Sequence, residues 1–382
     1  MPADTALDTF DLLDQAVRDR GPAAGFQWLI DRFREQKNYP LLFEARLMKK
    51  RHDLGLPLVL TDPATDWPPE IRRAYDEGCV EAAREVGGLF LADGDIARAW
   101  PYFRAIGETG PVAAAIDQVE PKEGVEPAIE IAFQEGVNPQ RGFELILAYH
   151  GICRAISLFP HYPVRQGRDE CLSLLVRTLH QELVASLKRA LVQAEDGAPD
   201  TSHIPTLIEG RDWMFEGTNY YVDTSHVVSV LQISLESADP ATLAAALEMA
   251  EYGKHLSPMF HYRGEPPFEN VYDDHAMYLK AVLGQDVDIA VAHFRAKAAA
   301  ADPEQAGTGA AQVLVGLLAR LKRFGEAIEA SLEFLKDVRA QQMACPSVPQ
   351  LCQMEGDAAR MKQLARDRGD LLSYAAGAMA EV

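Results

Sequence analysis

Residues 80–107, VEAAREVGGLFLADGDIARAWPYFRAIG, decide the fold. Apolar residues recur there at three- and four-residue steps on both sides of Gly94-Asp95, a pair of turn formers. The small and aromatic residues expected where two helices cross stand at regular positions: Gly87, Phe90, Ala99, Phe103 and Ile106. The stretch therefore predicts two antiparallel helices joined by a short connection.

The same helical period extends through the chain, and the alternation typical of strands is nearly absent. The segments with this period are 6–18, 24–36, 41–54, 70–92, 96–106, 141–159, 169–194, 222–236, 240–255, 271–283, 287–300, 309–321, 325–339 and 357–379. Glycine, proline and aspartate separate them, as at Gly21-Pro22 and Asp239-Pro240. Short connections between many helices of similar length predict an all-α fold of antiparallel helix hairpins.

Residues 80–107 resemble a tetratricopeptide repeat, in which small residues mark the helix crossing and aromatic residues pack between the helices. A similar but less regular unit spans 310–336, where Lys322 replaces the glycine before the turn. Shorter echoes lie at 281–297 and 351–367. The resemblance implies an α-solenoid of stacked hairpins, a fold that presents a concave binding surface.

Two irregular segments, 196–221 and 256–270, interrupt the helical pattern and are rich in turn formers and aromatic residues. A long loop in a helical domain is usually a binding element or a linker, and the aromatic content argues against a flexible linker. We therefore expect N-terminal helical repeats at 1–195 and C-terminal repeats with a loop-rich start at 196–382. The alternative is one continuous superhelix.

The composition narrows the range of partners. Acidic residues outnumber basic ones by 57 to 37, which gives a formal charge of -20. This charge repels phosphate groups, and no lysine- or arginine-rich block offsets it, so nucleic acid and anionic membranes are poor partners. No apolar run reaches membrane-spanning length, no signal-peptide pattern opens the chain, and the five cysteines form no Cys-x-x-Cys pair. We expect a soluble cytoplasmic protein.

Histidines on apolar helix faces are the strongest hint of a site. Four such residues are His150, His180, His226 and His275. Because both nitrogens of a buried imidazole need partners, they predict acids, carbonyls, water or a metal nearby. Asp223 precedes His226 by one helical turn, so the pair, completed by His150 or His275 to a set of two histidines and one carboxylate, could bind zinc, iron or manganese. Alternatively, each histidine is an ordinary core residue, and Asp223 is a helix cap.

Aromatic residues with polar tips accompany these histidines in the sequence. The candidates for ligand binding are Trp213, Tyr221, Tyr262 and Tyr272. Such side chains suit the walls of a ligand pocket, and they suit the core of a helix hairpin equally well.

The chain has no phosphate-binding glycine-rich loop, no Gly-x-Ser-x-Gly motif and no His-Glu-x-x-His motif, so no common enzyme signature identifies its function. Two functions therefore remain open. The first is a tetratricopeptide-like scaffold that binds a peptide, a protein or a small ligand in a concave or central groove. The second is a metal-dependent enzyme or a metal-binding protein with a central pocket of histidine and aspartate.

Overall fold

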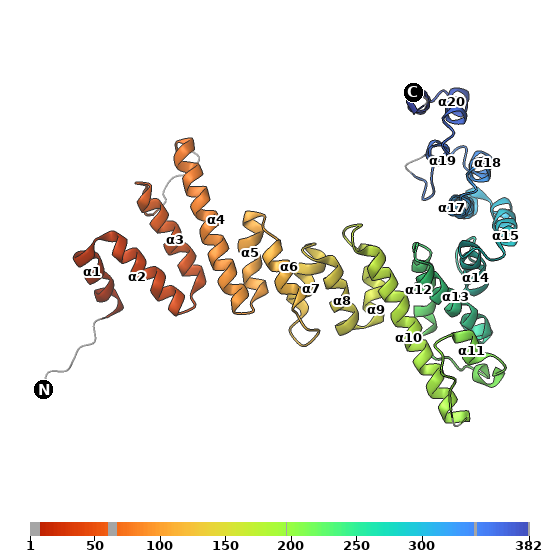
Figure 1. Cartoon of the computed structure of the whole chain (residues 1–382), viewed down its shortest axis with the longest axis horizontal. Helices are drawn as coiled ribbons and strands as arrows, with labels where there is room; N and C mark the ends of the chain where they lie inside the picture. The colour runs from red at the N-terminus through yellow and green to blue at the C-terminus, as the bar shows by residue number, and fades with distance from the viewer. Residues whose placement is uncertain (1–7, 60–66, 196, 340–341, 381–382) are drawn as a thin grey trace. The chain divides into compact units, whose positions relative to one another are not determined.

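The computed structural model describes residues 8–59, 67–195, 197–339 and 342–380. Within these ranges the chain is a succession of helices joined by turns, without a β-strand (Figure 1). The described residues contain one strand-like pairing, an isolated antiparallel bridge between Arg263 and Asn270. The prediction of an all-α fold is confirmed. No helix in the described ranges is both long and apolar enough to cross a membrane.

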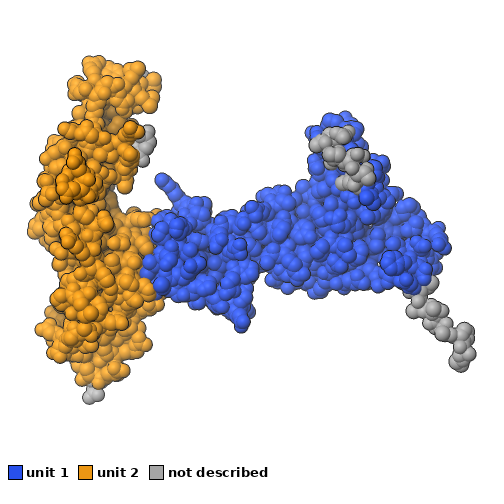
Figure 2. Space-filling view, turned by 180° about the vertical axis from the view of Figure 1, so that it is seen from behind, with its two compact units in different colours: residues 1–168 blue, residues 169–382 orange. Residues whose placement is uncertain are grey.

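The chain divides into two compact units, Met1–Arg168 and Asp169–Val382 (Figure 2). The division lies at the start of the long helix α10 (Arg168–Glu195). The boundary predicted near residue 196 follows the end of this helix and lies inside the second unit. Apolar residues are buried along the whole length of α10, which makes it part of a core rather than a linker: Leu172, Leu175, Leu179, Leu183, Leu187 and Leu191.

The described residues of the first unit form nine α-helices before α10: α1 (Thr9–Arg20), α2 (Pro22–Glu35), α3 (Tyr39–Asp53), α4 (Pro69–Ala92), α5 (Ile96–Ile106), α6 (Gly110–Asp117), α7 (Glu126–Ile129), α8 (Pro139–His150) and α9 (Ile152–Leu158). A π-helical turn, Glu130–Gln134, follows α7, and a 3-10 turn, Phe159–His161, follows α9. Each of the first five helices packs against the next one along the chain.

Residues 80–107, whose pattern predicts a helix hairpin, form the end of α4 and the whole of α5, and these helices pack against each other. Gly94 in the turn has a φ of 80°, a left-handed conformation that glycine adopts without strain. Asp95 caps α5, because its side chain accepts a hydrogen bond from the backbone N–H of Arg98 at 2.9 Å. A Cβ at Gly87 would lie 2.7 Å from the Phe103 ring, so the small residue lets the two helices approach. The predicted hairpin is confirmed.

The second unit continues from α10 with eleven further α-helices in its described residues: α11 (Ile204–Ile208), α12 (Thr224–Ser234), α13 (Pro240–His255), α14 (Val271–Val282), α15 (Val287–Ala300), α16 (Pro303–Ala306), α17 (Gly309–Arg320), α18 (Phe324–Phe334), α19 (Val348–Glu355), α20 (Ala358–Asp367) and α21 (Leu371–Ala380). Two 3-10 turns, Asp212–Phe215 and Pro258–Phe260, lie in the irregular segments. Buried apolar residues from α14 to α20 form one continuous core, which includes Phe294, Leu314 and Leu351.

A glycine in α13 makes room for an aromatic side chain of α14. A Cβ at Gly253 would lie 2.1 Å from Cδ1 and 2.3 Å from Cε1 of Tyr272. Tyr272 is only 2% exposed, so its ring has little freedom to move aside. The contact between these two helices therefore depends on the missing side chain.

We expect Gly253→Ala to lower the free energy of unfolding by about 2 kcal/mol, because the new methyl group displaces the Tyr272 ring. Gly316→Ala in α17 is the matched control, since a Cβ there would meet no atom closer than 4.0 Å. Urea unfolding followed by circular dichroism measures both variants. Equal stability of the two variants would contradict the close packing at Gly253.

Candidate functional site

The irregular segment between α13 and α14 reverses its direction just before α14 begins, and we call this chain reversal the return. Gly264 donates its backbone N–H to the Glu269 carbonyl at 3.2 Å. A Cβ at Gly264 would lie 2.2 Å from the Phe268 carbonyl oxygen, so the return leaves no room for a side chain there. The return pairs Arg263 with Asn270 in the antiparallel bridge.

A pocket of about 370 Å³ lies at this return, lined by residues 261–263 and 269–273. We call it the α14 pocket. Two of the four predicted ligand-binding aromatics, Tyr262 and Tyr272, line it together. Its volume is at the lower end of the range for small-molecule sites.

Tyr272 is the most buried aromatic residue of the α14 pocket. Its hydroxyl oxygen is buried and has no hydrogen-bond partner among the described residues. Burial raises the pKa of Tyr272, so the phenol is neutral at neutral pH and can donate a hydrogen bond. Native structures leave few buried polar groups unpaired, so this hydroxyl carries a cost that packing alone does not explain.

The rings of His261 and Tyr262 complete the aromatic wall. The His261 ring packs edge-on against Tyr272 with 5.5 Å between centroids, and its Nε2 donates to the Leu256 carbonyl at 2.9 Å. Tyr262 is 41% exposed, and its hydroxyl bonds to Thr224 Oγ1 at 2.9 Å. Each ring is thus fixed by a hydrogen bond to a neighbouring segment.

The other two predicted aromatics do not line the α14 pocket. Tyr221 donates its hydroxyl to the Met214 carbonyl and its backbone N–H to the Tyr252 hydroxyl, both at 3.0 Å. Trp213 is half-buried in the 3-10 turn Asp212–Phe215. The two bonds of Tyr221 hold the first irregular segment in place, so this residue has a structural role.

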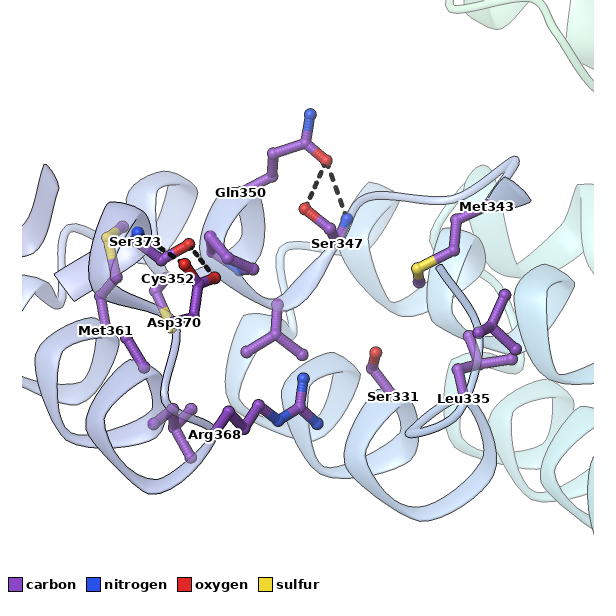
Figure 3. Close-up of a pocket in the computed structure, with 15 residues that line it drawn as sticks. Ser331, Leu335, Met343, Ser347, Gln350, Cys352, Met361, Arg368, Asp370 and Ser373 are labelled. Atoms are coloured by element: carbon purple, nitrogen blue, oxygen red, sulfur yellow. Dashed lines mark hydrogen bonds between the residues drawn. The ribbon is translucent and has the colours of Figure 1, made fainter. Parts of the chain in front are cut away.

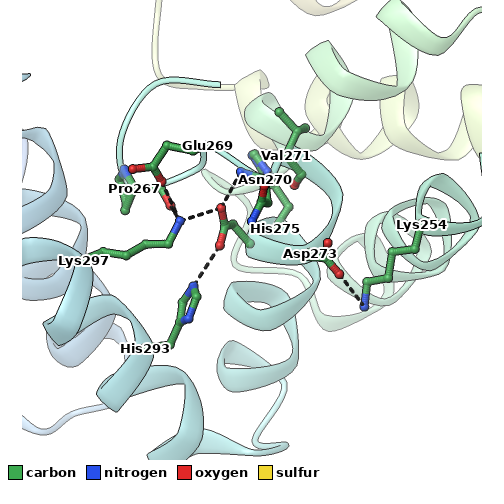
Figure 4. A network of polar contacts seen from close by, with 10 residues as sticks. Lys254, Pro267, Glu269, Asn270, Val271, Asp273, His275, His293 and Lys297 are labelled. Atoms are coloured by element: carbon green, nitrogen blue, oxygen red, sulfur yellow. Dashed lines mark hydrogen bonds and ion pairs between the residues drawn. The ribbon is translucent and has the colours of Figure 1, made fainter. Parts of the chain in front are cut away.

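A buried network centred on Asp274 adjoins the α14 pocket (Figure 4). Asp274 lies in the first turns of α14 and is 1% exposed. One of its carboxylate oxygens accepts a hydrogen bond from His293 Nε2 at 2.8 Å. The other accepts from Lys297 Nζ and from the backbone N–H of Asn270, each at 2.8 Å. His293 and Lys297 lie one turn apart on α15, so this helix presents both to one carboxylate.

Lys297 connects this network to the pocket. Its Nζ also donates to the Glu269 carboxylate at 2.5 Å and to the Pro267 carbonyl at 2.6 Å. Burial alone would lower the pKa of Lys297, but hydrogen bonds to Asp274 and Glu269 outweigh it and raise this pKa. Burial would raise the pKa of Glu269, and Lys297 lowers it instead. Lys297 and Glu269 therefore stay charged at neutral pH and tie the irregular segment to α15.

His275, a predicted metal ligand, is fully buried and bonds within its own helix. Its Nδ1 donates to the Val271 carbonyl at 2.6 Å, and its ring packs on Phe268 with centroids 4.3 Å apart. Its Nε2 is buried without a partner among the described residues. Burial lowers the pKa of His275 to about 4, so the imidazole is neutral at neutral pH. One ring nitrogen of His275 is thus bonded within its own helix, and no other side chain bonds to the ring among the described residues.

The remaining candidate ligands of the second unit do not gather around His275. His180 bonds to Glu248 at 2.9 Å, and His226 lies half-buried one turn after Asp223. In the described parts of the chain, no three histidine, cysteine, aspartate or glutamate side chains are grouped so that they could hold a metal ion. The metal-centre alternative therefore gains no support from the structure.

The prediction that His150 lies on a buried face is wrong. His150 is exposed, and so is Cys153, which follows it by three residues. The reason is that α8 ends at His150, and Gly151, with a φ of 79°, starts a new helix in another direction. Residues on the two sides of this glycine do not continue one helical stripe.

Asp223 acts as a helix cap, the alternative to metal binding. Its side chain accepts hydrogen bonds from the backbone N–H and the hydroxyl of Ser225, at 2.8 and 2.6 Å. We expect Asp223→Ala to lower the free energy of unfolding by about 1 kcal/mol, because the first turn of α12 loses this acceptor. Asp223→Asn keeps an acceptor and should stay near the wild type in urea unfolding. Equal losses in both variants would contradict the capping role.

A second pocket, of about 530 Å³, lies among α18, α19, α20 and the start of α21 (Figure 3). The polar groups at its rim already bond to each other: Ser347 to Gln350 at 2.8 Å, and Ser373 to Asp370 at 2.6 Å. Among its described lining residues, none carries a buried polar atom without a partner. It therefore gives a weaker indication of a ligand than the α14 pocket.

Sequence reasoning missed several residues of the site. Arg263, Asn270, His293 and Lys297 were not singled out, although the last two stand at the one-turn spacing that indicates a shared helix face. Asp274, the centre of the network, also accepts a hydrogen bond from the backbone N–H of Asn270, the N-cap residue of α14.

Comparison with known proteins adds no relative. No protein-family model matches the chain, and no curated protein matches it significantly. The assignment of a function therefore depends on the site itself.

Proposed function

We propose that this protein is a tetratricopeptide-like binding scaffold that holds a peptide or a small ligand in the α14 pocket. The observation that carries the proposal is the Tyr272 hydroxyl, which is buried and has no partner among the described residues, in a residue that lines the pocket. If Tyr272 served only for packing, phenylalanine would fill the position without the cost of an unpaired hydroxyl.

The fixed walls of the α14 pocket support the proposal. Lys297 of α15 bonds to Glu269 of the return before α14 and to Asp274 of α14, so it fixes the return to both helices. The hydroxyl of Tyr262 is bonded to Thr224. Walls held in this way lose little conformational entropy when a ligand binds, which favours affinity.

The net charge of the chain supports the proposed class of partner, and its free cysteines support the proposed compartment. A formal charge of -20 disfavours nucleic acid and anionic membrane surfaces as partners, so the partner is a peptide, a protein or a small molecule. All five cysteines are free thiols, which fits a reducing compartment such as the cytoplasm.

Tyr272→Phe tests the proposal with the full-length protein. A thermal-shift screen of metabolites and short peptides supplies ligands, and a ligand of the α14 pocket should protect backbone amides of residues 257–274 from hydrogen exchange. We expect Tyr272→Phe to weaken the binding of such a ligand. Without ligand, its free energy of unfolding should not fall, because the variant loses only an unpaired hydroxyl.

Tyr221→Phe is the matched control, because its hydroxyl has a partner, the Met214 carbonyl at 3.0 Å. We expect it to lose about 1 kcal/mol of stability and to bind the ligand like the wild type. The proposal fails if no ligand protects residues 257–274, or if Tyr272→Phe binds the ligand unchanged.

A further inference from the structure

Helix α21 contains no charged residue. Its sequence, LLSYAAGAMA at 371–380, has only Ser373 and Tyr374 as polar residues. The segment 342–354, QMACPSVPQLCQM, also lacks charged residues, although 25% of the whole chain is charged. A helix on the surface of a globular protein normally carries charged or polar residues on its outer side. The composition of α21 therefore predicts cover on more than one side of this helix.

The structure covers one side of α21 with α20. These two helices pack against each other, and Gly377 is buried at the contact, where a Cβ would lie 2.9 Å from Lys362 Cγ. Leu372 is 84% exposed, and Leu371 and Met379 are each 78% exposed. Steps of three and four residues along the helix join them into one apolar side, which we call the α21 face: Leu371, Leu372, Ala375, Ala376, Met379 and Ala380.

An open groove of about 850 Å³ adjoins the α21 face, and we call it the α19 groove. Leu372 and Ala376 belong to both the groove and the face. The rest of the lining comes from 343–354 and from α20, and it includes three methionines: Met343, Met354 and Met361. None of the described lining residues is charged. Methionine side chains are flexible and polarizable, so they adapt well to an apolar helix.

The charge pattern indicates which surface covers the α21 face. A charged partner would lose its water there and meet no opposite charge. The formal charge of -20 makes two copies of the chain repel each other as a whole, but two α21 faces can meet without bringing like charges together. A groove and an apolar helix side that share residues also fit a two-fold arrangement, in which each copy receives the same part of the other.

The exposed area is large enough for a weak dimer. Four side chains of the face and of the groove together expose on the order of 500 Å², similar to the largest apolar patches on typical monomers, which are often functional: Leu371, Leu372, Met379 and Met354. Covering this area on both copies buries about 1,000 Å² in total, the lower limit for a specific interface. A dimer of this kind should dissociate at micromolar concentrations.

We propose that a second copy of this chain covers the α21 face, so that α21 of each copy lies in the α19 groove of the other. Burial of the two apolar faces drives the association, and the two-fold arrangement closes it at two chains. The inference goes beyond the proposed function, because it does not involve the α14 pocket.

Sedimentation equilibrium of the full-length protein from roughly 1 to 100 µM tests the inference. We expect the average mass to rise from one chain to two, with a Kd on the order of 10 µM. Leu372→Glu puts a charge into the face and should weaken dimerisation by about tenfold or more. Ile289→Glu in α15 is the matched control, because Ile289 is 62% exposed and lies outside the face and the groove, and it should dimerise like the wild type.

Two further readouts are specific to this interface. Added salt should strengthen dimerisation, because it screens the repulsion between two acidic chains and the interface contains no ion pair to weaken. Backbone amides of residues 342–354 and 371–380 should exchange hydrogen more slowly in the concentrated protein than in the dilute protein.

Protein that stays monomeric over this range of concentrations would overturn the proposal and leave the face to a different partner. A dimer that Leu372→Glu and Ile289→Glu weaken equally, or one that leaves hydrogen exchange at 371–380 unchanged, would overturn it as well, because its interface lies elsewhere. A mass that grows beyond two chains without a plateau would overturn the two-fold arrangement.

Discussion

Asp274→Ala is expected to lower the free energy of unfolding by about 3 kcal/mol, because it removes the shared partner of two basic side chains from the interior. Asp274 is 1% exposed and bonds to His293, to Lys297 and to the backbone of Asn270. The side chain of Lys297 is 18% exposed, so in the variant its ammonium stays largely buried with one anionic partner fewer. The loss is limited because Lys297 keeps Glu269.

The neighbouring acid supplies the control for this experiment. Asp273→Ala removes a carboxylate from the same helix, but its side chain is 64% exposed and lies 3.9 Å from its lysine partner. A surface pair of this kind contributes about 0.5 kcal/mol or less. Urea unfolding of both variants at neutral pH separates the two cases. If both variants unfold at the same denaturant concentration, Asp274 does not hold the network together.

The helix hairpins were predictable because their determinants are local in the sequence. Gly94 and Asp95 specify a left-handed turn followed by a helix cap, and both features depend on neighbouring residues alone. The error at His150 was also local. Gly151 directly follows it, and a glycine at that place is a signal for the end of a helix.

The site was only partly predictable, because its polar partners are distant in the sequence. Tyr262 and Tyr272 could be proposed as pocket walls from residue type alone. Their meeting with Arg263 depends on the return at Gly264, where an absent side chain lets backbone approach backbone. The histidine periodicity favoured a shared centre, but a helical period fixes only which face a residue occupies. It does not fix whether the partner of His275 is another side chain or a carbonyl of its own helix, as observed.

Acidification is expected to destabilise the protein through His275. Burial lowers the pKa of this imidazole from 6.5 to about 4, so the unfolded chain takes up a proton at a higher pH than the folded chain does. The unfolded state is then favoured by protonation: stability is complete above pH 6.5 and falls as the pH drops toward about 4. This difference in pKa corresponds to roughly 3 kcal/mol.

His275→Gln isolates this contribution from the carboxylates that titrate in the same range. Both proteins contain the same aspartates and glutamates, so the difference between their unfolding free energies at each pH reports on His275. We expect the wild type to lose roughly 3 kcal/mol more than the variant between pH 6.5 and pH 4, measured by urea unfolding. Parallel curves would mean that the folded protein protonates His275 as readily as the unfolded chain does. The Nε2 atom, which is buried and has no partner in the described part of the chain, would then have to reach water or an acid in solution.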